Sequence, residues 1–244
     1  MGFIADDLAR ECASIRNAAA RGDLVCAVNH DVHVQNETWN IDLALGPPTG
    51  DALPVPAGTI RRATNPAAIR LAIEAKAIMT RHVGARRNRR RDVGAFRDYM
   101  ENFEPQAVRG AITIVNMATT FKSTIGIKRI NRHGNIEVTV KETATIFRNV
   151  PLRPLGSERG TVDANCMLVI EYDGVDQAAA RLVTKKPAPQ EGDPISYGTF
   201  LQRLCDAYGK RWGAGTGPAL PPELSVSTRQ FSEEVGRSLQ THLE

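Results

Sequence analysis

A short, mostly apolar segment that carries charged side chains constrains the fold of this chain more than any other feature. Residues 69–77 consist mostly of Ile, Leu and Ala, and their length and composition predict a strand of the protein core. Glu74 and Lys76 interrupt this segment, and they share one face because side chains alternate along a strand. Charges on a core strand are costly to bury unless something pairs with them. The segment therefore predicts a buried sheet with a charged site on it.

A second predicted strand, residues 38–45, carries one more isolated charge. Asp42 projects from one face of this strand, and the apolar side chains line the opposite face: Trp39, Ile41, Leu43 and Leu45. A divalent cation between Asp42 and Glu74 would supply a partner for both carboxylates, with Lys76 as a compensating positive charge. Two other readings stay open, namely that Asp42 is a satisfied core or strand-end residue, and that Asp51 or Glu37 takes its role.

The order of the predicted elements indicates a mixed α/β fold, with a central sheet flanked by helices. The first half is predicted to contain a helix over 6–20, strands over 24–34, 38–45 and 69–77, a helix over 79–103 and a strand over 110–117. The second half is predicted to contain strands over 136–147 and 166–172, a helix over 197–208 and another near the C-terminus. We expect one domain over residues 1–244. Its catalytic core is residues 6–117, and 118–244 add strands and helices that read DNA or form a dimer.

The two charged strands together resemble the motif of the PD-(D/E)xK nuclease superfamily. The matching residues are Ile41-Asp42-Leu43 on one strand and Ile73-Glu74-Ala75-Lys76 on the next, where Ile41 stands in place of the motif's Pro. Glu74-x-Lys76 is the only [DE]-x-K triplet in the chain. The superfamily's core runs helix-strand-strand-strand-helix-strand, the order predicted here for residues 6–117. An exposed Glu–Lys pair on a surface strand is the alternative, which the flanking apolar residues disfavour.

The resemblance implies a site-specific endonuclease of double-stranded DNA, most similar to type II restriction enzymes. It implies one or two Mg²⁺ ions per active site, held by Asp42, Glu74 and the backbone carbonyl of Ala75, with Lys76 stabilising the charge on the attacked phosphate. Glu11 on the first helix is a further candidate ligand. The alternatives are a modification-dependent or repair nuclease of the same fold, or a catalytically silent DNA-binding module. Cutting a palindrome is simplest for a two-fold homodimer.

Only seven of the 31 basic residues are lysines, so most of them are arginines. The net charge of the chain is +4. Arginine contacts phosphates and guanine edges well. The residues that we expect to bind DNA lie in the helix after Lys76 and in a second basic patch: Arg81, His82, Arg86, Arg87, Asn88, Arg89, Arg90, Lys122, Lys128, Arg129 and Arg132. A solvated charged face is the alternative for this run.

The cysteines and the absence of long apolar runs predict where the protein works. Four widely separated cysteines without C-x-x-C spacing are expected to be buried thiols in a reducing compartment, and a zinc site is not expected. No apolar run is long enough to span a membrane, and the N-terminus is expected to be neither a secretory signal nor a transit peptide. The expected location is the cytoplasm of a prokaryote.

Overall fold

The computed structural model describes residues 1–34, 37–63, 65–80, 82–122, 130–155, 157, 160–174 and 180–213. The helices are α1 (Gly2–Glu11), α2 (Ala13–Arg21), α3 (His82–Phe103), α4 (Ile136–Arg148) and α5 (Tyr197–Trp212). The strands are β1 (Val25–Val34), β2 (Glu37–Gly46), β3 (Arg61–Arg62), β4 (Leu71–Ile78), β5 (Val108–Asn116), β6 (Thr120–Lys122), β7 (Ile130–Arg132), β8 (Ala164–Glu171) and β9 (Arg181–Leu182).

A mixed sheet of seven strands forms the centre of the fold, in the order β3-β1-β2-β4-β5-β8-β9. β2 runs antiparallel to both of its neighbours, β1 and β4, whereas β4, β5 and β8 are parallel to one another. β6 and β7 form a separate antiparallel pair. The predicted α/β class with a mixed central sheet flanked by helices is confirmed.

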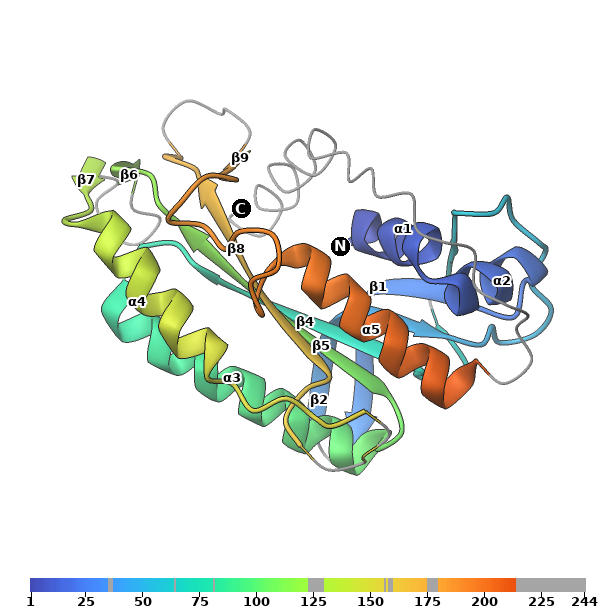
Figure 1. The fold of residues 1–244 in the computed structure, drawn as a ribbon. Helices are drawn as coiled ribbons and strands as arrows, with labels where there is room; N and C mark the ends of the chain where they lie inside the picture. The colour runs from blue at the N-terminus through green and yellow to red at the C-terminus, as the bar shows by residue number, and fades with distance from the viewer. Residues whose placement is uncertain are drawn as a thin grey trace.

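Helices cover both faces of the sheet (Figure 1). One buried cluster joins α1, α2 and α5 to the sheet through residues such as Leu8, Leu43 and Phe200. The other cluster joins α3 and α4 to the opposite face through residues such as Phe96 and Phe147. The apolar strands are buried because each face of the sheet packs against helices.

Residues 136–147, predicted as a strand, form most of helix α4. The segment is rich in Ile, Val and Thr, which favour strands when they are considered alone. Its buried residues nevertheless recur every three or four positions, at Ile136, Val140, Thr143, Ala144 and Phe147. This spacing places them on one side of a helix that packs on the sheet, so packing outweighs the intrinsic preference.

Two other predictions are corrected in detail. The predicted helix over 6–20 is two helices, because Cys12 between them has an extended backbone (φ −94°, ψ 108°). The apolar side chains of β2 also do not share one cluster, since Leu43 packs toward α5 and Ile41 packs toward α3. The pairing register places Asn29 of β1 opposite Asp42, and the left-handed backbone of Asn29 (φ 54°) interrupts the regular strand at this point.

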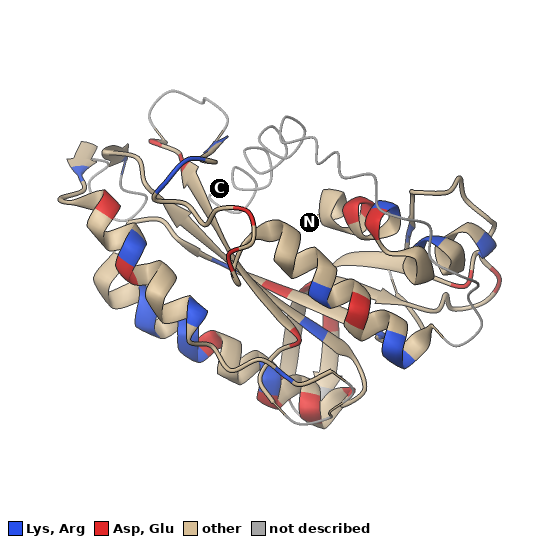
Figure 2. Cartoon of the chain, in the orientation of Figure 1, with Lys and Arg blue, Asp and Glu red and all other residues tan. Residues whose placement is uncertain are grey.

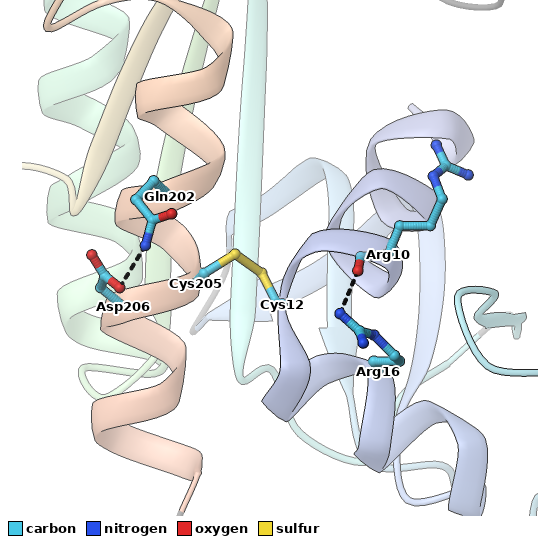
Figure 3. Close-up of a disulfide and its surroundings, with 6 residues drawn as sticks. All are labelled: Arg10, Cys12, Arg16, Gln202, Cys205 and Asp206. Carbon is cyan, nitrogen blue, oxygen red and sulfur yellow. Dashed lines mark hydrogen bonds between the residues drawn. A yellow bond between two sulfur atoms is a disulfide. The ribbon is translucent and has the colours of Figure 1, made fainter. Parts of the chain in front are cut away.

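A disulfide between Cys12 and Cys205 ties the junction of α1 and α2 to α5 (Figure 3). Their Cα atoms lie 5.1 Å apart, although the residues are 193 positions apart in the chain. The expectation of four thiols is therefore wrong for these two, whereas Cys26 and Cys166 are buried thiols. Within the described ranges, the helices are too short or too polar to cross a bilayer.

Candidate active site

The two charged strands separate from each other at the predicted site. β2 pairs with β4 only through Leu43, Ala44 and Leu45, and beyond them β2 continues in pairing with β1 alone. One further step of the same register places Asp42 opposite Glu74. The backbone N–H of Ala75 donates a hydrogen bond of 2.7 Å to Oδ2 of Asp42. The Asp42 carboxylate thus accepts the hydrogen bond of the Ala75 N–H at the point where the backbone hydrogen bonds between β2 and β4 end.

Glu74 is buried, with 3% of its surface exposed. It forms an ion pair with Nζ of Lys76, but neither of its carboxylate oxygens has a hydrogen bond of normal geometry to a described residue. Burial and the nearby charge of Asp42 raise the pKa of Glu74 to about 7, against the opposing influence of Lys76 and of the Trp39 indole. A buried carboxylate with unsatisfied oxygens is a costly arrangement for the protein alone.

Lys76 connects this buried carboxylate to the surface. Its side chain is 33% exposed, whereas the side chain of Glu74 is 3% exposed. On the neighbouring strand β5, Thr113 pairs with Lys76 in register and is buried. The site therefore has its carboxylate buried and its ammonium group partly exposed to solvent.

Trp39 is a site residue that the sequence pattern did not identify. Its ring lies 5.2 Å from the ring of Tyr99 on α3, between centroids. Its indole Nε1 is buried without a hydrogen-bond partner of normal geometry among the described residues, and its proximity lowers the pKa of Glu74. An apolar position on an alternating strand gave no signal of this role, because it depends on α3 folding back over β2.

The structure brings Asp42, Glu74 and Lys76 together, but it does not add Glu11 to them. Glu11 ends α1, in the helical layer that packs on the opposite face of the sheet from Ala72, the same-face neighbour of Glu74. Asp51 and Glu37 are exposed at other places in the fold. Across the described residues, no three side chains of His, Cys, Asp or Glu converge on one metal position.

The donors that remain are the two carboxylates and the backbone of Ala75. The N–H and C=O of a strand residue point to the same neighbouring strand. Since the N–H of Ala75 is directed at Asp42, its carbonyl is directed to the same side. Two carboxylates and a carbonyl are hard oxygen donors of the kind that Mg²⁺ prefers, with its other positions left to water and phosphate.

The predicted DNA-binding residues of α3 fall into different environments. His82 is buried, and its ring Nε2 lies 2.7 Å from the carbonyl oxygen of Asn116, to which it donates. Arg86 pairs with Glu142 of α4, and Arg89 pairs with Asp92 at 2.6 Å. The remaining three predicted residues of the helix are exposed: Arg87, Asn88 and Arg90.

The second predicted basic patch is only partly described. Lys122 ends β6, and Arg132 ends β7 with an exposed side chain. Arg81, Lys128 and Arg129 lie outside the described residues. The two described members therefore belong to the small antiparallel pair of strands, and Arg132 lines a pocket together with His82 at the start of α3.

No protein-family model, no curated protein and no solved structure matches this chain.

Proposed function

We propose that the protein is a metal-dependent endonuclease of double-stranded DNA with a restriction-endonuclease-like core. The observation that carries this proposal is the position of Asp42, opposite Glu74 where β2 leaves β4, with Lys76 beside them. The order of α2, β1, β2, β4, α3 and β5 supports it, because it is the helix-strand-strand-strand-helix-strand order of the superfamily that the motif resembles.

Mg²⁺ fits the donors at this site. The two oxygens of Glu74 lack normal hydrogen bonds, Asp42 lies opposite, and the Ala75 carbonyl is directed to the same side. These three groups would hold one or two ions, with waters and substrate phosphate completing the octahedral shell. When bound there, Mg²⁺ would polarise the scissile phosphate and lower the pKa of the attacking water.

The protein's own groups each have a defined task in this proposal. The N–H of Ala75 holds the Asp42 carboxylate in one orientation through the 2.7 Å hydrogen bond. Burial of Glu74 keeps that carboxylate away from bulk water, so its attraction for a cation is strong. Lys76, at the exposed edge, donates to the phosphate or orients the water once its ion pair with Glu74 is no longer needed for charge balance.

The finer assignment is to a type II restriction enzyme that cleaves at specific sites as a homodimer. A two-fold dimer places one Asp42–Glu74 site on each strand of a palindrome. The exposed arginines of α3 supply contacts to the DNA backbone, which position the protein without reading sequence.

Plasmid and phage DNA incubated with the protein in Mg²⁺, and separately in EDTA, tests the proposal. We expect discrete fragments in Mg²⁺ that disappear in EDTA and in both Glu74→Gln and Lys76→Met. Asp51→Asn is the matched control, since it removes an exposed carboxylate outside the site and should cleave normally. A smear of fragments would support nuclease activity but contradict cleavage at specific sequences. Intact DNA, methylated or not, would overturn the nuclease, and DNA binding without cleavage would favour the silent binding module.

A further inference from the structure

The arginines of α3 divide into neutralised and unneutralised groups. Arg86 and Arg89 each have an acidic partner, Glu142 and Asp92. Three more are exposed, and none of them forms an ion pair with a described residue: Arg87, Arg90 and Arg91. Figure 2 shows basic segments along α3 and α4, with acidic segments between them. The positive charge therefore remains on one part of the helix surface.

The unneutralised arginines line a groove of about 550 Å³ between α3 and α4. The lining residues are Arg87, Arg90, Arg91, Gly94 and Arg97 from α3, and Ile146, Val150, Pro151 and Thr161 from α4 and the segment after it. Among the described residues, no carboxylate lines the groove, and the partner of Arg97 is its neighbour Asp98. One wall of the groove is thus cationic and the other is mainly apolar.

This arrangement of arginines is electrostatically unfavourable when no ligand is bound in the groove. Arg87 lies three and four positions before Arg90 and Arg91, and like charges at these spacings repel on a helix. Within the described ranges, ion pairs join acids to Arg86 and Arg89 but not to these three. A polyanion in the groove would relieve the repulsion, and guanidinium groups are well suited to bidentate contact with phosphate.

The groove lies on the flank of α3 that faces away from the candidate active site. Tyr99 contacts Trp39, which borders Glu74, and so marks the flank of α3 toward the site. Arg90 precedes Tyr99 by nine residues, which is about two and a half turns of an α-helix, so the two point to opposite sides. A ligand in the groove is therefore separated by the helix from Asp42 and Glu74.

We propose that this groove binds the phosphodiester backbone of the DNA substrate outside the segment that is cleaved. The choice of DNA as the polyanion rests on the proposed function, and the location rests on the arginines. Arg87 and Arg97 are ten residues apart, or about 15 Å along the helix. At one phosphate per 3.4 Å of duplex axis on each strand, this length faces about four phosphates. Such contacts anchor DNA and carry no sequence information.

Equilibrium binding of a fluorescent 30-base-pair duplex in EDTA, over a range of salt concentrations, tests this inference. The variant is the triple substitution R87Q/R90Q/R91Q. We expect its affinity to fall about 100-fold near 0.1 M salt, and the slope of log K against log salt to lose about 2.7, at 0.9 per phosphate contact. The matched control R61Q/K185Q/K186Q removes the same charge from exposed positions outside the groove, and it should leave the slope nearly unchanged.

Equal binding by the triple variant and the wild type would contradict DNA binding in the groove. An equal loss of affinity in the control variant would also contradict it. Thermal unfolding shows whether the triple variant is folded. If it is not, the single substitution Arg90→Gln should still lower the slope by about 0.9. Competition by ATP distinguishes the two sources of phosphate, and displacement of the duplex by micromolar ATP would contradict a site for a polymer backbone.

The same measurement separates failure of this inference from failure of the nuclease. Binding in EDTA does not need the metal, so it is measured independently of cleavage. If the wild type binds DNA through the groove but never cleaves it, the result would support the groove as a DNA-binding site and contradict the proposed nuclease activity. If the triple variant cleaves DNA normally and its affinity is unchanged, the result would support the nuclease activity and contradict DNA binding in the groove.

Discussion

The Oδ2 atom of Asp42 accepts a 2.7 Å hydrogen bond from the backbone N–H of Ala75, the residue between Glu74 and Lys76. This bond joins β2 to β4 one step beyond their last paired residues, Leu43 and Ile73. It therefore fixes the carboxylate of Asp42 against the strand that carries the other charged groups. The two strands separate beyond this point, and the hydrogen bond sets the orientation of the Asp42 carboxylate.

Substitution of Asp42 separates its hydrogen bond from its charge. Asp42→Asn keeps an oxygen that can accept from Ala75, so its free energy of unfolding should stay near that of the wild type. Asp42→Ala removes the acceptor and should lose about 1 kcal/mol. Both should lower Mg²⁺-dependent cleavage at least about 100-fold, because both remove a metal ligand. Wild-type cleavage by Asp42→Asn would exclude the carboxylate from catalysis.

Glu74 should make the metal-free protein less stable as the pH rises. Burial and Asp42 raise its pKa from 4.5 to about 7, so between these values the folded protein binds more protons than the unfolded chain does. The free energy of unfolding therefore falls with rising pH across this window and levels off above it. Glu74→Gln should be more stable than the wild type at pH 8 in EDTA, by up to about 3 kcal/mol. Denaturant unfolding should give similar stabilities for the two at pH 4.5, and a persistent difference there would contradict this origin.

Asp163 should contribute strongly to stability through a buried network. Burial alone would raise its pKa, but hydrogen bonds from Arg153 and Arg211 outweigh burial and lower it. Its carboxylate also accepts a 2.8 Å hydrogen bond from the N–H of Arg109. Asp163→Ala leaves Arg153 buried without its acid and should lose about 3 to 5 kcal/mol.

The contribution of Asp163 should depend on pH in the opposite direction to that of Glu74. Because the folded-state pKa is lowered, the stabilisation is present above the unfolded-state value of about 3.8 and is lost as the pH falls through the folded-state value. Thermal unfolding at pH 7 and at about pH 2 should show the gap between wild type and Asp163→Ala narrowing in acid. A gap of constant size would indicate that packing, and not charge, is the cause.

The bond between Cys12 and Cys205 should stabilise the packing of α5 on α1 and α2. It closes a loop of 193 residues, so reduction should lower the free energy of unfolding by about 2 to 4 kcal/mol. Thermal unfolding with and without a thiol reductant measures this loss. The double variant C12S/C205S should melt at the same temperature in both conditions. A reductant effect that survives in this variant would show that the Cys12–Cys205 bond is not its cause.

The strands of the site could be predicted from sequence because their signals are local. Glu74 and Lys76 stand out in an apolar strand, and Asp42 stands out in an alternating one. The helix over Ile136–Arg148 was missed, since Ile, Val and Thr favour a strand until their spacing is weighed against a packing partner. The approach of Trp39 to Glu74 could not be predicted because it depends on tertiary structure.

The neutralisation of individual arginines and the pairing of the cysteines could not be predicted for the same reason. The run from Arg86 to Arg91 looks uniform in sequence, but Glu142, 56 residues from Arg86, neutralises one of its members. Cys12 and Cys205 are brought within 5.1 Å, between Cα atoms, by the packing of α5. Contacts between distant segments decide both features, and spacing along the chain does not report them.

Terbium luminescence gives the most direct test of whether Asp42 and Glu74 bind one cation together. Tb³⁺ is a hard cation that takes oxygen ligands, and Trp39, which borders Glu74, can transfer excitation energy to it. We predict saturable luminescence that Mg²⁺ displaces, that falls sharply in Asp42→Asn, Glu74→Gln and Trp39→Phe, and that persists in Trp212→Phe, since Trp212 packs instead against Arg70. Luminescence that is absent from the wild type, or unchanged in both carboxylate variants, would contradict a metal site between β2 and β4.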